Sequence, residues 1–212
     1  MSEAAVTPSL RRGDSPGWFG KMPHLGDFVS RRLPHEFIHG WDDWLQGGMS
    51  RARAELGAAW PERYLVAPVR RFWLAPALLG DTGWAGVLMP SVDAVGRYFP
   101  LTIAAAVPDH ALAAVLAARA WFRAIDAAGR KVLDVNFRPD DLDVELAQVA
   151  PLPLETPADL QARTLAGAWL APDRSQTGSL WWCGDASEAT PVDRFASLPS
   201  AAAFCALLLE PG

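Results

Sequence analysis

Three apolar runs at 69–74, 84–89 and 101–107 are rich in residues that favour β-strands, and they constrain the fold more than any other feature of the chain. The links between them, 75–83 and 90–100, are short. A parallel connection needs a crossover of about a dozen residues or more, usually a helix. The three runs are therefore predicted to pair as an antiparallel meander.

Helical periodicity on either side of these runs predicts an α/β domain. Apolar residues recur at helical spacing from Phe37 to Leu56, after Pro34 in the first turn and before a stop at Gly57. The pair Gly47-Gly48 predicts a close packing contact or a bend within this helix. Further helices are expected at 110–125 after a cap at Asp109, at 141–148, from a capping signal at 156–159 to 170, and at 198–209. Further strands are expected at 18–21 and at 179–183.

Length and charge limit the function classes. The 212 residues suit one domain, expected at 17–212 after a flexible segment at 1–16. A net charge of -5 argues against nucleic acid as a partner and against a polybasic membrane contact. The two cysteines, Cys183 and Cys205, lie in apolar surroundings, which favours a reducing compartment over a disulfide scaffold. No export signal or membrane-length apolar run is visible, so a cytoplasmic location is expected.

One catalytic motif is present in the sequence. His35-Glu36-x-x-His39 matches the zinc-protease pattern, which needs two imidazoles one turn apart, a carboxylate and a third protein ligand. Both histidines are predicted to share the polar helix face with Asp42 and Asp43, opposite the apolar stripe, and no third ligand is evident. The match is interpreted as accidental. No P-loop, nucleophile elbow, dinucleotide fingerprint or cysteine zinc spacing occurs, and no cofactor is expected.

Two loops carry the remaining charged candidates. Asp27 lies near Arg31 and Arg32, and Asp93 lies near Arg97. Such groups at strand ends could form an anion or phosphoester site. The simpler interpretation is that each aspartate caps a turn and each arginine pairs with one of them.

Tryptophan is unusually frequent, with ten in the chain. Most are expected in the core, and one or two partly exposed indoles would suit a protein that binds a partner. Trp41 is a core candidate because it lies within the apolar stripe. Trp181 and Trp182 are neighbours on one strand, so they must point to opposite sides of it.

Taken together, several stretches resemble the TagF (also ImpM) family of type VI secretion accessory proteins. The matching stretches are Gly20-Lys21-Met22-Pro23-x-x-Gly26-Asp27-Phe28-Val29, Leu33-Pro34 with Phe37, Trp41-Asp42-x-Trp44-Leu45, Ser50-Arg51, Leu56-Gly57 with Trp60, Ala67-Pro68 with Arg71-Phe72, and Gly86-Val87-Leu88-x-Pro90-Ser91-Val92-Asp93-x-Val95-Gly96-Arg97-Tyr98-Phe99-Pro100-Leu101. Arg70 and Ala94 depart from the pattern, and the second half of the chain matches only in general layout.

The resemblance implies a regulator and not an enzyme. The implied fold is a three-layer α/β/α sandwich with a largely antiparallel (mixed) central sheet. The implied function is that of a cytoplasmic, post-translational repressor, which keeps the secretion machine unassembled by binding its forkhead-associated scaffold protein. Gly26 and Gly96 are expected where loops need freedom in φ, and Asp27 and Asp93 where backbone N–H groups hold a loop. The candidate partner-binding or motif-loop residues are Lys21, Gly26, Asp27, Arg31, Asp42, Ser91, Asp93, Gly96 and Arg97.

A hydrolase remains the alternative, either zinc-dependent at His35, Glu36 and His39 or phosphoester-directed at Asp27 and Asp93. The sequence does not determine the oligomeric state, the face that meets a partner or the signal that lifts repression.

Overall fold

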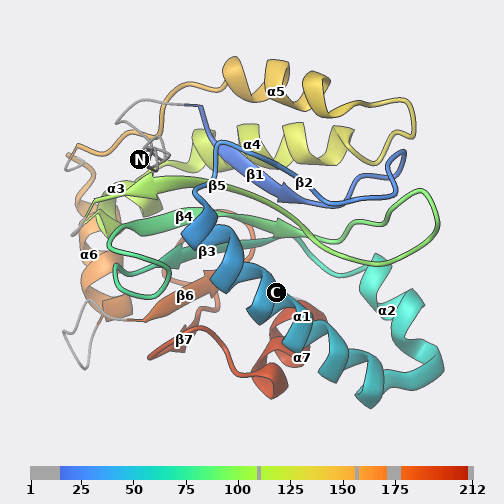
Figure 1. The fold of residues 1–212 in the computed structure, drawn as a ribbon. Helices are drawn as coiled ribbons and strands as arrows, with labels where there is room; N and C mark the ends of the chain where they lie inside the picture. Colours follow the sequence, from blue (N-terminus) through green and yellow to red (C-terminus); the bar gives the residue numbers. More distant parts are fainter. Residues whose placement is uncertain (1–14, 109–110, 156–157, 171–177, 210–212) are drawn as a thin grey trace, which may run out of the picture.

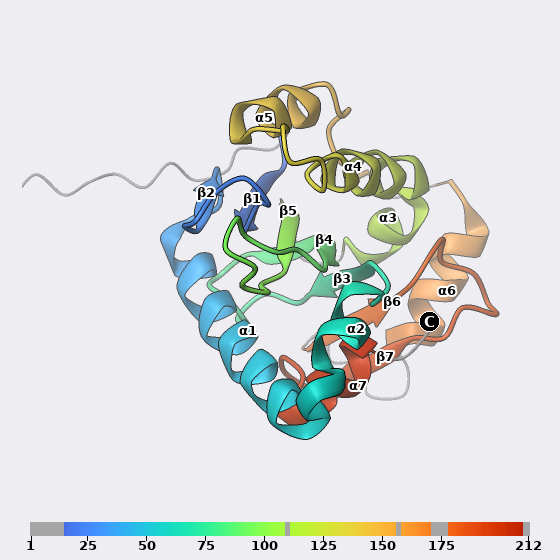
Figure 2. The same cartoon turned by 90° about the vertical axis from the view of Figure 1, so that its right-hand side faces the viewer.

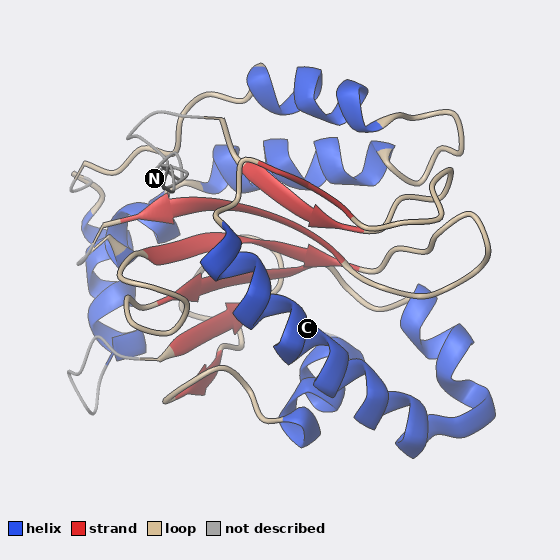
Figure 3. Ribbon diagram, in the orientation of Figure 1, coloured by secondary structure: helices blue, strands red, loops and turns tan. Residues whose placement is uncertain are grey.

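The predicted meander forms the centre of the fold. In the computed structural model, which describes residues 15–108, 111–155, 158–170 and 178–209, β3 (Arg70–Leu74), β4 (Gly83–Met89) and β5 (Leu101–Val107) pair antiparallel in sequence order. Figure 3 shows these strands at the middle of the sheet, with helices around it. The pairing follows from the short links, as the sequence predicts.

Four shorter strands extend the sheet on both sides. The order is β2-β1-β5-β4-β3-β6-β7, where β1 is Gly17–Gly20, β2 is Val29–Arg31, β6 is Ser179–Trp182 and β7 is Asp193–Phe195. All pairs among the described strands are antiparallel, so the α/β class and the antiparallel pairing are confirmed, and the parallel pairs that a mixed sheet would contain do not occur among them. The short strand predicted at 18–21 corresponds to β1, whereas β2 and β7 were not predicted, because each is three residues long and mostly exposed.

One face of the sheet is covered by α1 (His35–Leu56) and α7 (Ala201–Leu209), which lie against each other (Figure 1). The core beneath them is aromatic. Trp41 is fully buried and stacks on Trp181, and its indole N–H donates to Thr102 Oγ1 at 2.8 Å. Gly48 confirms the predicted close contact, because a Cβ there would lie 2.3 Å from the Phe204 ring, whereas a Cβ at Gly47 would meet nothing.

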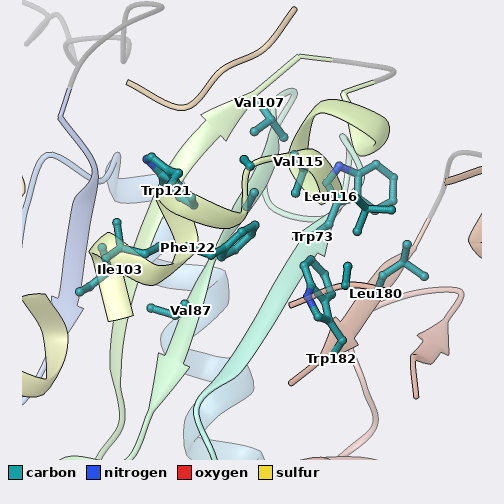
Figure 4. Packing of buried hydrophobic residues seen from close by; sticks show 14 of the residues in the cluster. Trp73, Val87, Ile103, Val107, Val115, Leu116, Trp121, Phe122, Leu180 and Trp182 are labelled. Atoms are coloured by element: carbon teal, nitrogen blue, oxygen red, sulfur yellow. The ribbon is translucent and has the colours of Figure 1, made fainter. Parts of the chain in front are cut away.

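The opposite face packs against α3 (Leu112–Ala117), α4 (Arg119–Lys131) and α6 (Leu160–Leu170), and α5 (Pro139–Ala147) lies alongside α4 (Figures 1 and 2). Figure 4 shows Phe122 of α4 over the sheet, where its ring meets that of Trp182 edge-on at 5.5 Å. Trp182 belongs to this core and Trp181 to the other, as their alternation on β6 predicts. Nine tryptophans are buried, and Trp44 is half-buried.

Several predicted boundaries need correction. The helix expected at 110–125 is broken at Ala118, where ψ is 40°, into α3 and α4, and α4 continues to Lys131. The turn of helix at 57–59 and α2 (Trp60–Leu65) were not predicted. Asp109 and residues 156–157 of the predicted caps lie outside the described residues, but Asp159 accepts from the N–H groups of Gln161 and Ala162 at the start of α6. Within the described ranges, no helix combines the length and apolarity needed to cross a membrane.

Candidate functional site

Two loops that carry most of the family-like residues meet at one corner of the sheet. Because β1 pairs antiparallel with β5, the end of β1 lies beside the start of β5, which brings loop 21–28 next to loop 90–100. The Ala94 N–H donates to the Leu25 carbonyl at 2.9 Å, and the Arg97 guanidinium donates to the Gly26 carbonyl. We call these two loops the two-loop corner. They hold each other through direct hydrogen bonds.

The carboxylate of Asp93 organises the corner from inside. Its side chain is fully buried and accepts from Lys21 Nζ at 2.6 Å and from Arg97 Nε at 2.6 Å. It also accepts from the backbone N–H groups of Val95 at 3.1 Å and Arg97 at 2.8 Å. Burial alone would raise the pKa of Asp93, but the hydrogen bonds from Lys21 and the 95–97 turn together hold it below its ordinary value. The group is therefore a fixed anion.

Ser91 joins the corner to α2. The Tyr64 hydroxyl accepts from the Ser91 N–H and donates to the Ser91 carbonyl, both at 3.0 Å, and the Ser91 hydroxyl donates to the Lys21 carbonyl at 2.7 Å. Both side chains are buried, and burial raises the pKa of Tyr64. Tyr64 therefore stays neutral and acts as a clamp, a role that sequence reasoning missed because α2 was not predicted.

Phe28 and Val95 present apolar surface at this corner. Phe28 is 46% exposed although its ring stacks on Phe19 at 5.7 Å and meets Phe99 edge-on at 4.6 Å. Lys21 Nζ lies 4.7 Å from the centre of the Phe28 ring, and Val95 is 70% exposed. The aromatic ring is thus held in place by its neighbours while one side of it faces solvent.

The structure brings together only some of the residues that were predicted to bind a partner or to form motif loops. Lys21, Gly26, Ser91, Asp93, Gly96 and Arg97 lie in the two-loop corner. Gly96 adopts φ of 80°, as expected, but Gly26 does not need positive φ. Asp42 lies on α1, where its carboxylate accepts from Gln46.

The predicted pairing around Asp27 is wrong. Asp27 is exposed and makes no hydrogen bond or ion pair with the described residues. Arg31 and Arg32 instead pair with Asp143 of α5, at 3.5 and 2.8 Å. Arg31 at the end of β2 and Arg32 just after it face a helix that is distant in the chain, and sequence reasoning could not place that helix beside them.

The residues of the zinc-like motif lie on the outer face of α1, as predicted. His35, Glu36 and His39 are exposed, and His39 Nδ1 lies 3.2 Å from Asp43 Oδ2. Among the described residues, no group of three or more His, Cys, Asp or Glu side chains is placed to hold a metal ion. The phosphoester pair is not assembled either, since both oxygens of Asp93 are occupied by donors within the corner.

Comparison with known proteins fits this arrangement. Residues 17–149 match the family described as TagF N-terminal domain, type VI secretion system-associated, a range that includes the whole two-loop corner. The fold is similar to the crystal structure of PA0076 from Pseudomonas aeruginosa PAO1, with a TM-score of 0.76, 38% sequence identity, and coverage of 93% of this chain and 96% of that chain. No curated protein matches the chain. The chain therefore belongs to the TagF family, and it is a type VI secretion-associated protein.

Proposed function

We propose that this protein is a cytoplasmic, post-translational repressor of type VI secretion that acts by binding the forkhead-associated scaffold of the machine through the two-loop corner. The observation that carries the proposal is Phe28, an aromatic side chain that is 46% exposed on a rigid frame. The charged groups beneath it, Lys21 and Asp93, are already paired with each other, so they support the surface and are not poised to react.

The chemistry of the corner suits protein binding. Interface hot spots are enriched in aromatic residues and arginine, and a preformed surface loses less entropy on association. Phe28 and Val95 supply exposed apolar area, and the Arg97 side chain, 57% exposed, borders it. Because Arg97 is fixed by Asp93 and by the Gly26 carbonyl, the arginine and the ring keep one relative geometry before any partner arrives.

A pull-down with paired variants tests the proposal. Purified full-length chain should capture the scaffold, and Phe28→Ala with Val95→Ala should weaken capture by at least about tenfold, as expected for truncated hot-spot residues. The matched control is Leu65→Ala with Val66→Ala, which removes apolar side chains that are 54% and 79% exposed on α2 and the residue after it. The control should bind the scaffold as the unmodified chain does, and urea unfolding should show that both variants fold.

The possible failures are distinguishable. No capture by the unmodified chain, together with normal secretion in a deletion strain, would refute the regulator and its partner. If the Phe28 and Val95 variant still captures the scaffold and the α2 control does not, the scaffold is the partner but the two-loop corner is not the surface that binds it. In cells, deletion should raise secretion-dependent activity, and the corner variant should fail to restore repression.

We also infer that the architecture is a three-layer α/β/α sandwich. Helices α1 and α7 against one face of the sheet, and α3, α4 and α6 against the other, support this description.

A further inference from the structure

Three arginines converge on one turn at a separate place in the molecule, beyond the end of β6. Arg71 of β3 donates through Nη1 to Asp185 Oδ1 at 2.9 Å, and Arg123 of α4 donates through Nε to Asp185 Oδ2 at 3.1 Å and through Nη2 to the same oxygen. Arg119, the first residue of α4, reaches the Ala186 carbonyl through Nη2 at 3.4 Å. The cations therefore approach from a strand and from a helix.

The turn that carries Asp185 has a defined geometry. The Thr190 hydroxyl donates to the Asp185 carbonyl at 3.0 Å and accepts from the Ser187 N–H at 2.9 Å. Arg71 is fixed from the other side, because its guanidinium lies 5.0 Å from the centre of the Phe122 ring and its side chain is 7% exposed. The cluster of guanidinium groups therefore includes one, that of Arg71, which is buried and held in place.

Among the described residues, one carboxylate, that of Asp185, pairs with the guanidinium groups of this cluster. The guanidinium groups of Arg71 and Arg123 contact this carboxylate, and that of Arg119 reaches only a backbone carbonyl, in a chain whose net charge is -5. The three groups carry roughly fifteen N–H donors, and the described residues accept from four of them. Arg119 Nε is buried and has no hydrogen-bond partner among the described residues. A buried charged donor without an acceptor is costly, so this nitrogen is a candidate donor to an anion.

The cluster is open to solvent on one side. The Arg123 side chain is 66% exposed and that of Asp185 is 31% exposed, so an incoming anion can reach both. The α4 N-terminus lies here as well, and its cap residue Ala118 supplies no side-chain acceptor. Helix N-termini add a favourable field for anions.

We propose that Arg71, Arg119 and Arg123 form an anion site for a phosphate-type dianion, and that Asp185 is an internal occupant which the ligand replaces. A carboxylate has two oxygens, and both already accept from Arg71 and Arg123, which leaves Arg119 to bond a carbonyl. A tetrahedral phosphate has oxygens for all three guanidinium groups, and two negative charges match the surplus better than one. This site does not depend on the proposed repressor role.

Calorimetric titration of the full chain with inorganic phosphate tests the site. Asp185→Asn removes the competing charge at nearly constant shape, so it should bind one phosphate at least about tenfold more tightly than the unmodified chain. Adding Arg123→Gln to that variant should reverse the gain. Arg130→Gln is the matched control, because Arg130 lies on the same helix, is 58% exposed and pairs with Asp126. It should leave phosphate binding unchanged.

The result that overturns the proposal is a folded Asp185→Asn chain with no saturable phosphate binding, or binding that Arg123→Gln and Arg130→Gln weaken equally. If Asp185→Asn does not fold, phosphate is titrated into the unmodified chain instead. Weak saturable binding that Arg123→Gln abolishes supports the site, and the absence of saturable binding overturns it. Phenyl phosphate identifies the source of the ligand. Binding as tight as that of inorganic phosphate indicates a phosphomonoester, and much weaker binding indicates free phosphate.

Discussion

Asp93 and Asp185 are built alike and differ in their access to water. Each carboxylate lies between two cations, Lys21 and Arg97 for Asp93, and Arg71 and Arg123 for Asp185. The Asp93 side chain is fully buried and accepts two backbone N–H groups as well, whereas that of Asp185 is 31% exposed and, within the described part of the chain, accepts from arginines alone. The same pairing therefore fixes a loop in one place and leaves a replaceable charge in the other.

The difference has an energetic basis. Removing one partner of a buried ion pair leaves an uncompensated charge in low dielectric, which costs about 3–5 kcal/mol. A pair in contact with water is worth about 1 kcal/mol or less, because solvent screens it and can replace either partner. Lys21 is buried together with Asp93, so the two-loop corner falls in the first class. The pair that Asp185 makes with the mostly exposed Arg123 falls in the second, and its pair with the buried Arg71 lies between the two classes.

The largest expected effect comes from Asp93→Ala. We expect a loss of about 3–5 kcal/mol in the free energy of unfolding, since Lys21 would be left buried without its counterion. Asp185→Ala, the matched change, should cost less, because the carboxylate that it removes is 31% exposed and one of its two partners, Arg123, is mostly exposed. Urea unfolding at neutral pH measures both. Equal losses would break the comparison and place the two turns in one energetic class.

The dependence of stability on pH should show the next largest difference between the two aspartates. The pKa of Asp93 in the folded chain is lowered by its hydrogen bonds against the effect of burial, and that of Asp185 is lowered mainly by Arg123. A lowered folded pKa means that the unfolded chain binds more protons near pH 4, so stability is present above that pH and falls as pH decreases. Urea unfolding between pH 6 and about 3 should therefore show a shallower loss in Asp93→Asn than in the unmodified chain.

Asp185→Asn provides the control for this acid experiment. It should reduce the slope of stability against pH less than Asp93→Asn does, because the Asp185 carboxylate is partly exposed to solvent and accepts no backbone N–H from the described residues. A larger change in slope for Asp185→Asn would contradict the assignment of Asp93 as the fixed anion of the molecule.

Patterns within one element were predictable from the sequence. The periodicity of α1 placed Trp41 in the core and the two histidines on its outer face, and the short links imposed the meander. Asp93 and Arg97 were paired correctly because they lie four residues apart in one turn. These predictions depend on spacing, which sequence alone records.

Contacts between distant segments were not predictable in this way. Lys21 and Asp93 are 72 positions apart, and Arg32 reaches Asp143 of α5, so their pairing depends on how the sheet orders its strands. Tyr64 was missed because α2 is a short helix whose role appears only once it packs beside Ser91. Asp185 lies beyond the residues that the family pattern covers, and the three arginines, although within that range, carry no local signal that they meet at one turn.

A smaller effect is expected from the hydroxyl clamps of the two turns. Tyr64→Phe should cost about 1–3 kcal/mol, because the Ser91 N–H loses its acceptor in a buried setting. Thr190→Val removes the corresponding hydroxyl from the half-buried Asp185 turn and should cost less than about 1 kcal/mol, since water can replace it. Urea unfolding of both variants measures the two losses in the free energy of unfolding. A costlier Thr190→Val would show that the Asp185 turn is the more rigid of the two.

The smallest effect should come from Arg123→Gln. Asp185 keeps Arg71 as a partner and the Arg123 side chain is mostly exposed, so the melting temperature should fall by less than about 2 °C. That small loss should disappear in about 0.5 M salt, because ions already screen an exposed pair over this range. Thermal unfolding at low and high salt measures it. A large loss that salt leaves unchanged would mean that Arg123 is structural, and Asp185 would then be a second fixed anion like Asp93 instead of a group that a ligand can replace.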